Sequence, residues 1–256
     1  MSLTYEDRRS TILKQLEMEG KVQVHLLSAE FNVSTETVRR DLDRLEKEGR
    51  LRKVYGGAVK VRSDRVEPPF LKRAQMMREE KVSVGKLAAS LIPDGETVIL
   101  DNGTTTLEIL RHLGNRPDVT LITHSVPVLT AAMDMFAGKI IFAGGEINRH
   151  YQAATGALTD RLLDQFKVNK AFISVGGISL VDGITDYHLD EALLSQKIMQ
   201  RAEESILVAD HTKFGVTTFA RVAKLEEFSM VITDSGCPRD WIDSVEALGI
   251  EMRISS

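Results

Sequence analysis

One polar segment of the sequence, Asp101-Asn102-Gly103-Thr104-Thr105-Thr106, has the residue types of an anion-binding loop. It follows the apolar run Thr97–Leu100, which predicts a buried strand, and it opens a helical pattern that runs to Leu113. Free N–H groups at the start of a helix attract anions, and glycine permits a close approach of the backbone. From these residues alone, an anion site and an ordinary capped turn are about equally good interpretations.

Other polar or glycine-bearing segments follow predicted strands. Gly176 and Gly177 come at the end of the run Lys170–Val175, and Lys213 follows the run Ser205–Ala209. Open α/β sheets bind ligands at the carboxyl ends of their strands. The pattern therefore predicts a cleft at one rim of a sheet, with Lys213 available to pair with a phosphate. For Lys213 alone, the alternative is a solvent-exposed lysine.

A second chemistry is indicated near the N-terminus, where Ser34 is a plausible N-cap for a helix that runs to about Glu48. On that helix Val38, Leu42 and Leu45 share one face, which leaves a polar face centred on Arg40. Arginine can bind guanine through two hydrogen bonds, and the first turn of a recognition helix meets base edges. The leading candidates for base contacts are Thr35, Glu36, Thr37 and Arg40. The alternative is a three-helix bundle with a solvated charged face.

A basic hairpin is predicted directly after this helix. Two short alternating runs flank Gly56-Gly57, which is a hairpin signal, and Arg50, Arg52 and Lys53 precede the turn. Basic residues there suit phosphates, which fix position without reading sequence. The complete set of expected DNA contacts is Ser34, Thr35, Glu36, Thr37, Arg39, Arg40, Arg44, Arg50, Arg52, Lys53, Tyr55, Gly56 and Gly57.

The elements that must position these residues divide the chain in two. Helical patterns over Tyr5–Glu19 and Val24–Phe31 precede the recognition helix, and a stop is expected at Gly49. From residue 96 onward, β-branched runs alternate with helical stretches, which indicates a mainly parallel sheet. We expect a winged helix-turn-helix over residues 1–61, a linker over 62–77 and an α/β effector-sensing domain over 78–256. The seven expected strands are Thr97–Leu100, Thr120–Thr123, Lys139–Ala143, Lys170–Val175, Ser205–Ala209, Met230–Thr233 and Glu251–Ile254.

Charge and composition agree with two parts that have different partners. The net charge is −4, but residues 1–65 hold 14 Lys and Arg against 11 Asp and Glu, whereas the remainder holds 19 against 26. No apolar run is long enough for a membrane span, the N-terminus does not resemble a signal peptide, and a cytoplasmic location is expected. The six histidines form no metal-binding motif, so neither a metal nor a cofactor is predicted.

The N-terminal motif resembles that of a known family. The string Val33-Ser34-Thr35-Glu36-Thr37-Val38-Arg39-Arg40-Asp41-Leu42-Asp43-Arg44-Leu45, followed by Val54-Tyr55-Gly56-Gly57-Ala58, is similar to the head of DeoR-type transcriptional regulators. The resemblance extends over essentially the whole chain. It implies a bacterial DNA-binding regulator, usually a repressor of carbohydrate operons, that responds to phosphorylated sugars or related metabolites.

The C-terminal part resembles ribose-5-phosphate isomerase. Asn102–Thr106 is similar to the phosphate-binding loop of that enzyme, and Lys213 stands at a lysine position of its D-E-S-K segment. The segment matching the enzyme's carboxylate motif is Val175–Ser179, which holds no carboxylate, and the catalytic lysine position falls near Tyr187. Isomerisation needs a base and a proton donor at the carbonyl, so the resemblance implies binding without turnover. Asp182, Asp186, Asp190 and Glu191 leave open another arrangement of acids, with sugar-hydroxyl contacts or helix N-terminal charges as the alternative.

The function predicted is a sequence-specific DNA-binding regulator that represses a carbohydrate-metabolism operon, senses a phosphorylated sugar and works as a homo-oligomer. Its partners would be operator DNA and the effector, with no membrane. The expected effector contacts are Asp101, Asn102, Gly103, Thr104, Thr105, Thr106, Gly176, Gly177, Asp186 and Lys213. Two rival functions are a sugar-phosphate isomerase or deaminase with a helical head, and a winged helix that binds protein instead of DNA.

Overall fold

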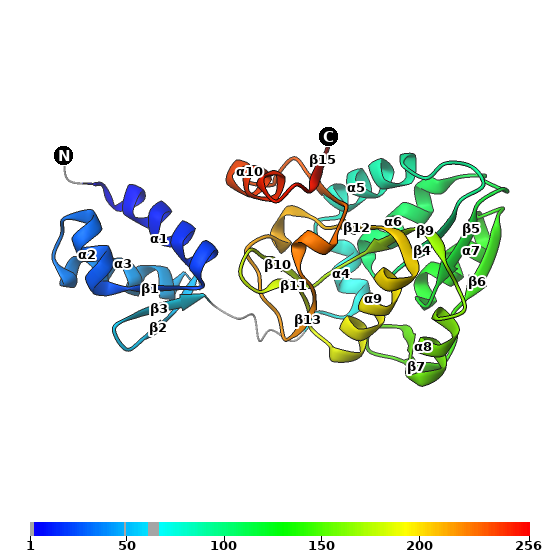
Figure 1. Ribbon diagram of the computed structural model, residues 1–256, viewed down its shortest axis with the longest axis horizontal. Coiled ribbons are helices and arrows are strands. Elements are labelled where there is room, and N and C mark those ends of the chain that lie inside the picture. The colour runs from blue at the N-terminus through cyan, green and yellow to red at the C-terminus, as the bar shows by residue number, and fades with distance from the viewer. Residues whose placement is uncertain (1–2, 49, 61–66) are drawn as a thin grey trace.

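The computed structural model describes residues 3–48, 50–60 and 67–256, which form a small N-terminal unit and a larger C-terminal unit (Figure 1). The N-terminal unit, here called the head, contains α1 (Tyr5–Glu19), β1 (Lys21–Gln23), α2 (Val24–Phe31), α3 (Thr35–Lys47), β2 (Leu51–Val54) and β3 (Gly57–Lys60). Helix α1 begins after a capping box between Thr4 and Asp7 and ends at Gly20, whose φ is 72°. The three helices and the hairpin confirm the expected architecture of the head.

The core of the head is built from one apolar stripe of each helix. On α3 the stripe is Val38, Leu42 and Leu45, all with no exposed surface, as the helical spacing predicted. Ser34 caps α3, since its hydroxyl accepts a hydrogen bond from the Thr37 N–H at 3.2 Å. The stop expected at Gly49 lies outside the described residues.

The strands of the head form a sheet in the order β1-β3-β2. The β2–β3 hairpin pairs Leu51 with Lys60 and Val54 with Gly57, so the turn is Tyr55-Gly56 and Gly57 already belongs to a strand. Strand β1 was not expected from the sequence, because three residues are too few to show a periodic pattern. It joins the hairpin to the helices.

The larger unit, here called the sensor domain, starts with two helices and continues as alternating strands and helices. Its elements are α4 (Phe70–Gln75), α5 (Arg78–Ser90), β4 (Thr97–Leu100), α6 (Thr104–Leu113), β5 (Thr120–Thr123), α7 (Val126–Met135), β6 (Lys139–Phe142), β7 (Glu146–Asn148), β8 (Ala153–Thr155), α8 (Ala157–Leu163), β9 (Val168–Ile173), β10 (Gly177–Ser179), β11 (Gly183–Asp186), α9 (Leu189–Arg201), β12 (Ala202–Val208), the short 3-10 helix η1 (His211–Lys213), β13 (Ala220–Ala223), η2 (Leu225–Glu227), β14 (Met230–Asp234), α10 (Arg239–Ala247) and β15 (Glu251–Ser255).

A seven-stranded sheet in the order β15-β14-β12-β9-β4-β5-β6 forms the centre of the sensor domain (Figure 1). Every neighbouring pair in it is parallel, and each of the seven predicted strands contributes. The strands are continuously apolar because both faces are covered. On β4, for example, Val98 and Leu100 pack with helices α4 to α7, whereas Ile99 packs in the opposite core with α8 to α10.

Several short elements were not expected from the sequence. The antiparallel sheet β10-β11-β13 and the pair β7-β8 are built from strands of three or four residues. The expected linker over 62–77 also needs correction, because residues 70–75 form α4. Phe70 is buried in the sensor core, and Arg73 forms an ion pair with the buried Glu67 at 2.7 Å. Residues 67–77 therefore pack with the sensor domain, while 61–66 lie outside the described residues.

Candidate functional site

The outward face of α3 has the geometry expected of a recognition surface. Thr35, Glu36, Arg39 and Arg40 are all exposed on the first turns of the helix. Glu36 lies 3.7 Å from Arg39 and 3.7 Å from Arg40, so its carboxylate holds both guanidinium groups on the same side. Exposed ion pairs of this kind contribute little to stability, so these arginines remain free to exchange Glu36 for a phosphate or a base edge.

The hairpin presents a second exposed surface next to α3. Tyr55 at its tip is fully exposed, and Arg50 and Arg52 are exposed as well. The hairpin is tied to α3 because the Lys53 N–H donates to the Glu46 carboxylate at 2.7 Å and the Lys53 ammonium pairs with Asp43. Basic side chains of the hairpin and of α3 therefore belong to one rigid body.

Four of the expected DNA contacts, Arg44, Ser34, Thr37 and Gly57, serve packing or capping within the head. The Arg44 guanidinium lies 4.9 Å from the centre of the Tyr5 ring, which is a cation–π geometry. The hydroxyls of Ser34 and Thr37 lie 3.0 Å apart and cap the helix. Gly57 is needed for packing, since a Cβ there would lie 2.0 Å from the Val22 carbonyl oxygen. The surface most open to a partner is thus Thr35, Glu36, Arg39 and Arg40 together with the hairpin.

In the sensor domain, Asp101 at the end of β4 organises a buried polar cluster. Its Oδ1 accepts from the Asn102 N–H at 2.8 Å and lies 2.9 Å from His124 Nε2. Its Oδ2 accepts from the Ser195 hydroxyl of α9 at 2.8 Å. Both carboxylate oxygens are therefore satisfied, and β4, β5 and α9 are joined at the carboxyl rim of the sheet.

His124 is held as an imidazolium by this cluster. The side chain is fully buried, its Nε2 faces the Asp101 carboxylate, and its Nδ1 lies 3.1 Å from the Ala154 carbonyl oxygen. Both partners are acceptors only, so both ring nitrogens must carry protons. Burial lowers the pKa of His124, but the hydrogen bond and charge of Asp101 outweigh it and leave that pKa raised. With both N–H groups engaged, His124 cannot serve as a base.

Asn102 connects the cluster to Glu191. Its amide group donates to the Glu191 Oε2 at 2.8 Å and to the Tyr151 carbonyl at 3.0 Å, and its Oδ1 accepts from Ser125 at 2.8 Å. The other carboxyl oxygen of Glu191 is buried and has no hydrogen-bond partner among the described residues. Burial raises the pKa of Glu191 to about 8, against the opposing effects of the His124 charge and of the Asn102 hydrogen bond. A buried, half-satisfied carboxyl is a feature typical of a ligand site.

A second carboxyl, Asp186, lies at the end of β11 beside Glu191. Burial and the charge of Glu67 raise the pKa of Asp186 to about 7. One of its oxygens accepts from the N–H groups of Tyr187 and His188 at 2.6 and 3.4 Å. His188 Nε2 lies 3.4 Å from Glu67 without a hydrogen bond between them. This end of the site is therefore rich in groups that can bind hydroxyls.

The start of α6 provides the opposite, anion-attracting end. Gly103 is required there because a Cβ would lie 2.3 Å from the Ser174 side chain, where the ends of β4 and β9 meet. Thr106 is used internally, since its hydroxyl donates to the Asp101 and Gly103 carbonyls at 2.8 and 3.0 Å. The hydroxyls of Thr104 and Thr105 bond to none of the residues that the structure describes. No side chain caps α6, so its first N–H groups are open to an anion.

A lysine that the sequence analysis missed, Lys81, adds positive charge at this end. Helices α5 and α6 flank β4 in the chain and run the same way, and Gly85 of α5 packs on Glu108 of α6. Lys81 is one helical turn before Gly85 and therefore lies on the side of α5 that packs against α6. Its ammonium donates to the Arg73 and Met76 carbonyls at 2.6 and 2.7 Å, which leaves one donor.

The charge of Lys213 acts on Lys81. Burial lowers the pKa of Lys81 to about 8. The charge of Asp210 raises this pKa and the charge of Lys213 lowers it, each by less than burial does. A sequence signal for Lys81 exists, since it precedes Val84 and Ala88 on the buried stripe of α5, where a lysine is unusual.

The remaining candidates are placed as follows. A side chain at Gly176 would meet the Tyr187 ring and the Thr218 hydroxyl, whereas Gly177 packs on the Val216 carbonyl. The Thr218 Oγ1 is buried without a hydrogen-bond partner among the described residues. Of the open alternatives among the acids, Asp182 accepts from the Thr217 hydroxyl at 2.9 Å, and Asp190 is exposed on the first turn of α9. Neither joins the cluster around Asp101.

Two further findings concern residues 3–48, 50–60 and 67–256 only. In these ranges, no three His, Cys, Asp or Glu side chains are grouped to hold a metal ion. The same ranges contain no helix that is long and apolar enough to cross a bilayer. The single cysteine, Cys237, is buried, and burial raises the pKa of its thiol to about 12.

Comparison with known proteins supports both parts of this description. Residues 8–64 match the DeoR-like helix-turn-helix domain, and residues 76–235 match the DeoR C terminal sensor domain. The chain is 34% identical over 248 residues to the putative aga operon transcriptional repressor of Escherichia coli O157:H7, covering 96% of this chain and 92% of that protein. It is 33% identical over 250 residues to the HTH-type transcriptional repressor GlcR of Bacillus subtilis (strain 168), covering 98% and 96%.

Comparison with solved structures gives partial matches. Ribose 5-phosphate isomerase A of Methanocaldococcus jannaschii has a TM-score of 0.41 at 20% identity, over 54% of this chain and 55% of that one. The probable sor operon regulator of Shigella flexneri has a TM-score of 0.41 at 12% identity, over 67% and 88%. The two domain matches and the relatives that span nearly the whole chain lead to one assignment. This chain belongs to the DeoR family of DNA-binding transcriptional regulators.

Proposed function

We propose that the chain represses a carbohydrate operon and that a phosphorylated sugar, bound in the sensor domain without turnover, controls it. The observation that carries the proposal is a site with two chemically different ends. The start of α6, Lys81 and Lys213 offer N–H groups and positive charge, whereas Glu191 and Asp186 offer carboxyl oxygens at the same rim. A sugar phosphate has a matching anionic end and hydroxyl end.

The expected effector contacts change in two respects in this proposal. Thr106 serves the loop itself, because its hydroxyl is committed to two carbonyls. Lys81 and Glu191 join the contacts, the first for the phosphate and the second for hydroxyls. Binding without turnover is favoured because His124 has both N–H groups engaged and no carboxylate occurs in Val175–Ser179.

Control of transcription would follow from a shift between two arrangements of the heads. Winged helix-turn-helix proteins usually bind paired half-sites, so two heads must be held at a fixed spacing by a homo-oligomer. An effector changes that spacing only if it binds one arrangement more tightly than the other. In this scheme the head binds the operator, and the sensor domain, with residues 67–77 packed against it, binds the effector.

The first test is stabilisation by ligand. A phosphorylated sugar at a hundred times its dissociation constant should raise the free energy of unfolding by about 2.7 kcal/mol, whereas the unphosphorylated sugar should not. Lys213→Ala should weaken binding by roughly 10- to 100-fold, because it removes a hydrogen bond to a charged group. Unfolding can be followed by the fluorescence of Trp241, the only tryptophan, which packs against Phe214 in the sensor domain.

The matched control is Lys86→Ala, which changes an exposed lysine on α5. It should leave ligand stabilisation as in the wild type. Equal stabilisation by phosphorylated and unphosphorylated sugars would contradict the phosphate part of the proposal. Steady conversion of the sugar phosphate in a coupled assay would contradict binding without turnover.

The second test concerns the recognition face. Arg40→Ala should weaken binding to the operator by about 1–3 kcal/mol, because one arginine that contacts a base supplies discrimination of that size. Binding to unrelated DNA should change much less, which a titration of both duplexes at one salt concentration can measure. Arg78→Ala, an exposed change outside the head, is the control. Operator affinity unaltered by Arg40→Ala would place the base contacts elsewhere.

A further inference from the structure

An apolar stripe lies on the outward face of α9. Leu189 is 55% exposed and Leu193 51% exposed, and Gln196 and Gln200 continue the same stripe of the helix. Beside the stripe, Phe219 at the start of β13 is 79% exposed. Single exposed apolar residues are ordinary, but three large ones on two neighbouring elements indicate a contact surface.

Strand β13 borders this stripe as an edge strand. It ends the sheet order β10-β11-β13, and Gln196 of α9 donates to the Arg221 carbonyl at 3.1 Å. Side chains alternate along the strand, so Ala220 and Val222 are buried while Phe219 and Arg221 face outward. Helix and strand together form one outward surface, which we call the α9–β13 face: Leu189, Leu193, Gln196, Gln200, Phe219 and Arg221.

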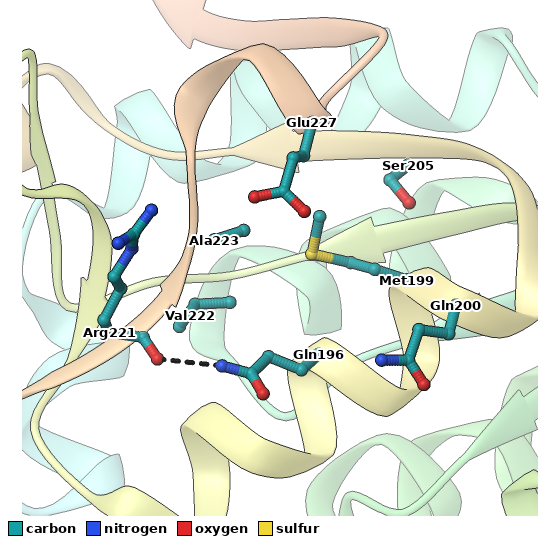
Figure 2. Close-up of a pocket in the computed structure, with 8 residues that line it drawn as sticks. All are labelled: Gln196, Met199, Gln200, Ser205, Arg221, Val222, Ala223 and Glu227. Atoms are coloured by element: carbon teal, nitrogen blue, oxygen red, sulfur yellow. Dashed lines mark hydrogen bonds between the residues drawn. The ribbon is translucent and has the colours of Figure 1, made fainter.

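A hollow of about 520 Å³ indents the α9–β13 face (Figure 2). It shares none of the residues that form the effector site. Arg221 and Glu227 reach it from different sides, and no interaction joins them in the close-up. The Arg221 guanidinium has no ion-pair partner in the part of the chain that the structure describes.

The charges on this face select its partner. Nucleic acid would need an excess of positive charge, but Arg221 is balanced by Glu227 in the same hollow. A surface that carries both signs is complementary to its own copy, because a two-fold axis brings residue i of one chain to residue j of the other and the reverse. Arg221 of each copy would then meet Glu227 of the other, with the apolar side chains packed beside them.

We propose that the α9–β13 face is the surface through which two copies of this chain associate by their sensor domains. This proposal rests on the proposed function, in which a homo-oligomer holds two heads at a fixed spacing. It adds the surface of the sensor domain that joins the two copies. Helix α9 also links this surface to the effector site, since Glu191 and Ser195 face inward to Asn102 and Asp101. A ligand that moves α9 moves the interface, and small helix shifts at interfaces are a known route for switching.

The test is a charge exchange in the full chain, with molar mass measured by sedimentation. Arg221→Glu and Glu227→Arg should each raise the dissociation constant of the sensor-mediated contact by about 30-fold or more, because each leaves like charges facing across the interface. The double variant Arg221→Glu/Glu227→Arg should recover most of the wild-type association. Phe219→Ser should weaken association without affecting the charges.

Met133→Ser is the matched control, since Met133 is 66% exposed on α7, and it should keep the wild-type mass. Far-ultraviolet circular dichroism checks that each variant is folded. A monomeric wild type at tens of micromolar, single variants with wild-type mass, or a double variant as weak as the singles would each overturn the interface. Binding of one head to one operator half-site is measured separately. Variants that associate weakly but still bind a half-site would leave the proposed recognition face unaffected.

Discussion

Replacement of Asp101 with alanine is expected to lower the free energy of unfolding of the sensor domain by about 3–5 kcal/mol, the usual loss when one partner of a buried charged pair is removed. The variant leaves the His124 imidazolium without its carboxylate and the Ser195 hydroxyl and Asn102 N–H without their acceptors. The measurement is equilibrium unfolding by urea, followed by Trp241 fluorescence, without any ligand.

Two comparisons separate charge from hydrogen bonding. Asp101→Asn keeps an acceptor toward His124 and the Asn102 N–H but removes the negative charge, so it should restore only part of the loss. Asp118→Ala changes an exposed aspartate before β5 and should change stability by less than about 0.5 kcal/mol. A loss below about 1 kcal/mol for Asp101→Ala would mean that the pair does not hold the rim together.

The pH dependence of stability is expected to change with Glu191→Gln. Because the pKa of Glu191 is about 8 in the folded chain and ordinarily 4.5 for a free glutamate, the folded state keeps a proton that the unfolded state releases between these limits. Stability therefore falls as pH rises through this range, by about 1.4 kcal/mol per pH unit for each such proton. Glutamine still accepts from Asn102 but cannot titrate. The slope of the free energy of unfolding against pH should therefore decrease by the equivalent of up to one bound proton.

Two other groups act in the same direction and will keep part of the slope. The pKa of Asp186 is raised to about 7, so ionisation of this carboxyl also lowers the free energy of unfolding as pH rises. The pKa of His124 is raised as well, and its contribution is full below its unfolded value and lost as pH passes its folded value. Glu79→Gln on the exposed face of α5 is the control and should leave the slope unchanged. A slope identical in wild type and Glu191→Gln would contradict the buried, protonated carboxyl.

Asp101 could be predicted as a site residue from the sequence, whereas Glu191 could not. Asp101 stands in a motif that can be recognised by eye, directly after an apolar run and before a helix. Glu191 lies 89 residues after Asn102 in the chain, and only its hydrogen bond to Asn102 shows that it belongs to the same site. A buried glutamate at the start of a helix has the same local pattern as one that stabilises the helix N-terminus.

In the head, too, the sequence predicted which face of α3 points outward but not which side chains make contacts within the domain. The spacing of Val38, Leu42 and Leu45 was enough to place Arg40 outward, and the structure has those three residues buried. The spacing could not show that Arg44 lies over the Tyr5 ring or that Lys53 pairs with Asp43, because both partners are distant in sequence. Contacts within the head therefore determine which of the basic side chains stay available to bind DNA.

The sequence by itself determined the elements whose pattern is long and periodic. Seven apolar runs became the seven strands of the parallel sheet, and the helices of the head lie where the apolar spacing placed them. These features follow from burial, which the sequence records as one apolar stripe along each helix and as a continuous apolar run in each strand that is covered on both faces.

Only the tertiary structure decided which rim residues form a site. It brought Lys81 of α5 within the electrostatic influence of Lys213, it brought Glu191 of α9 to Asn102, and it committed Thr106 to the loop itself. Charge and hydrogen bonding act across space between groups far apart in sequence, so no local pattern records them. The polar loop after β4 remains the centre of the site, and the fold supplied the partners that give it two chemically distinct ends.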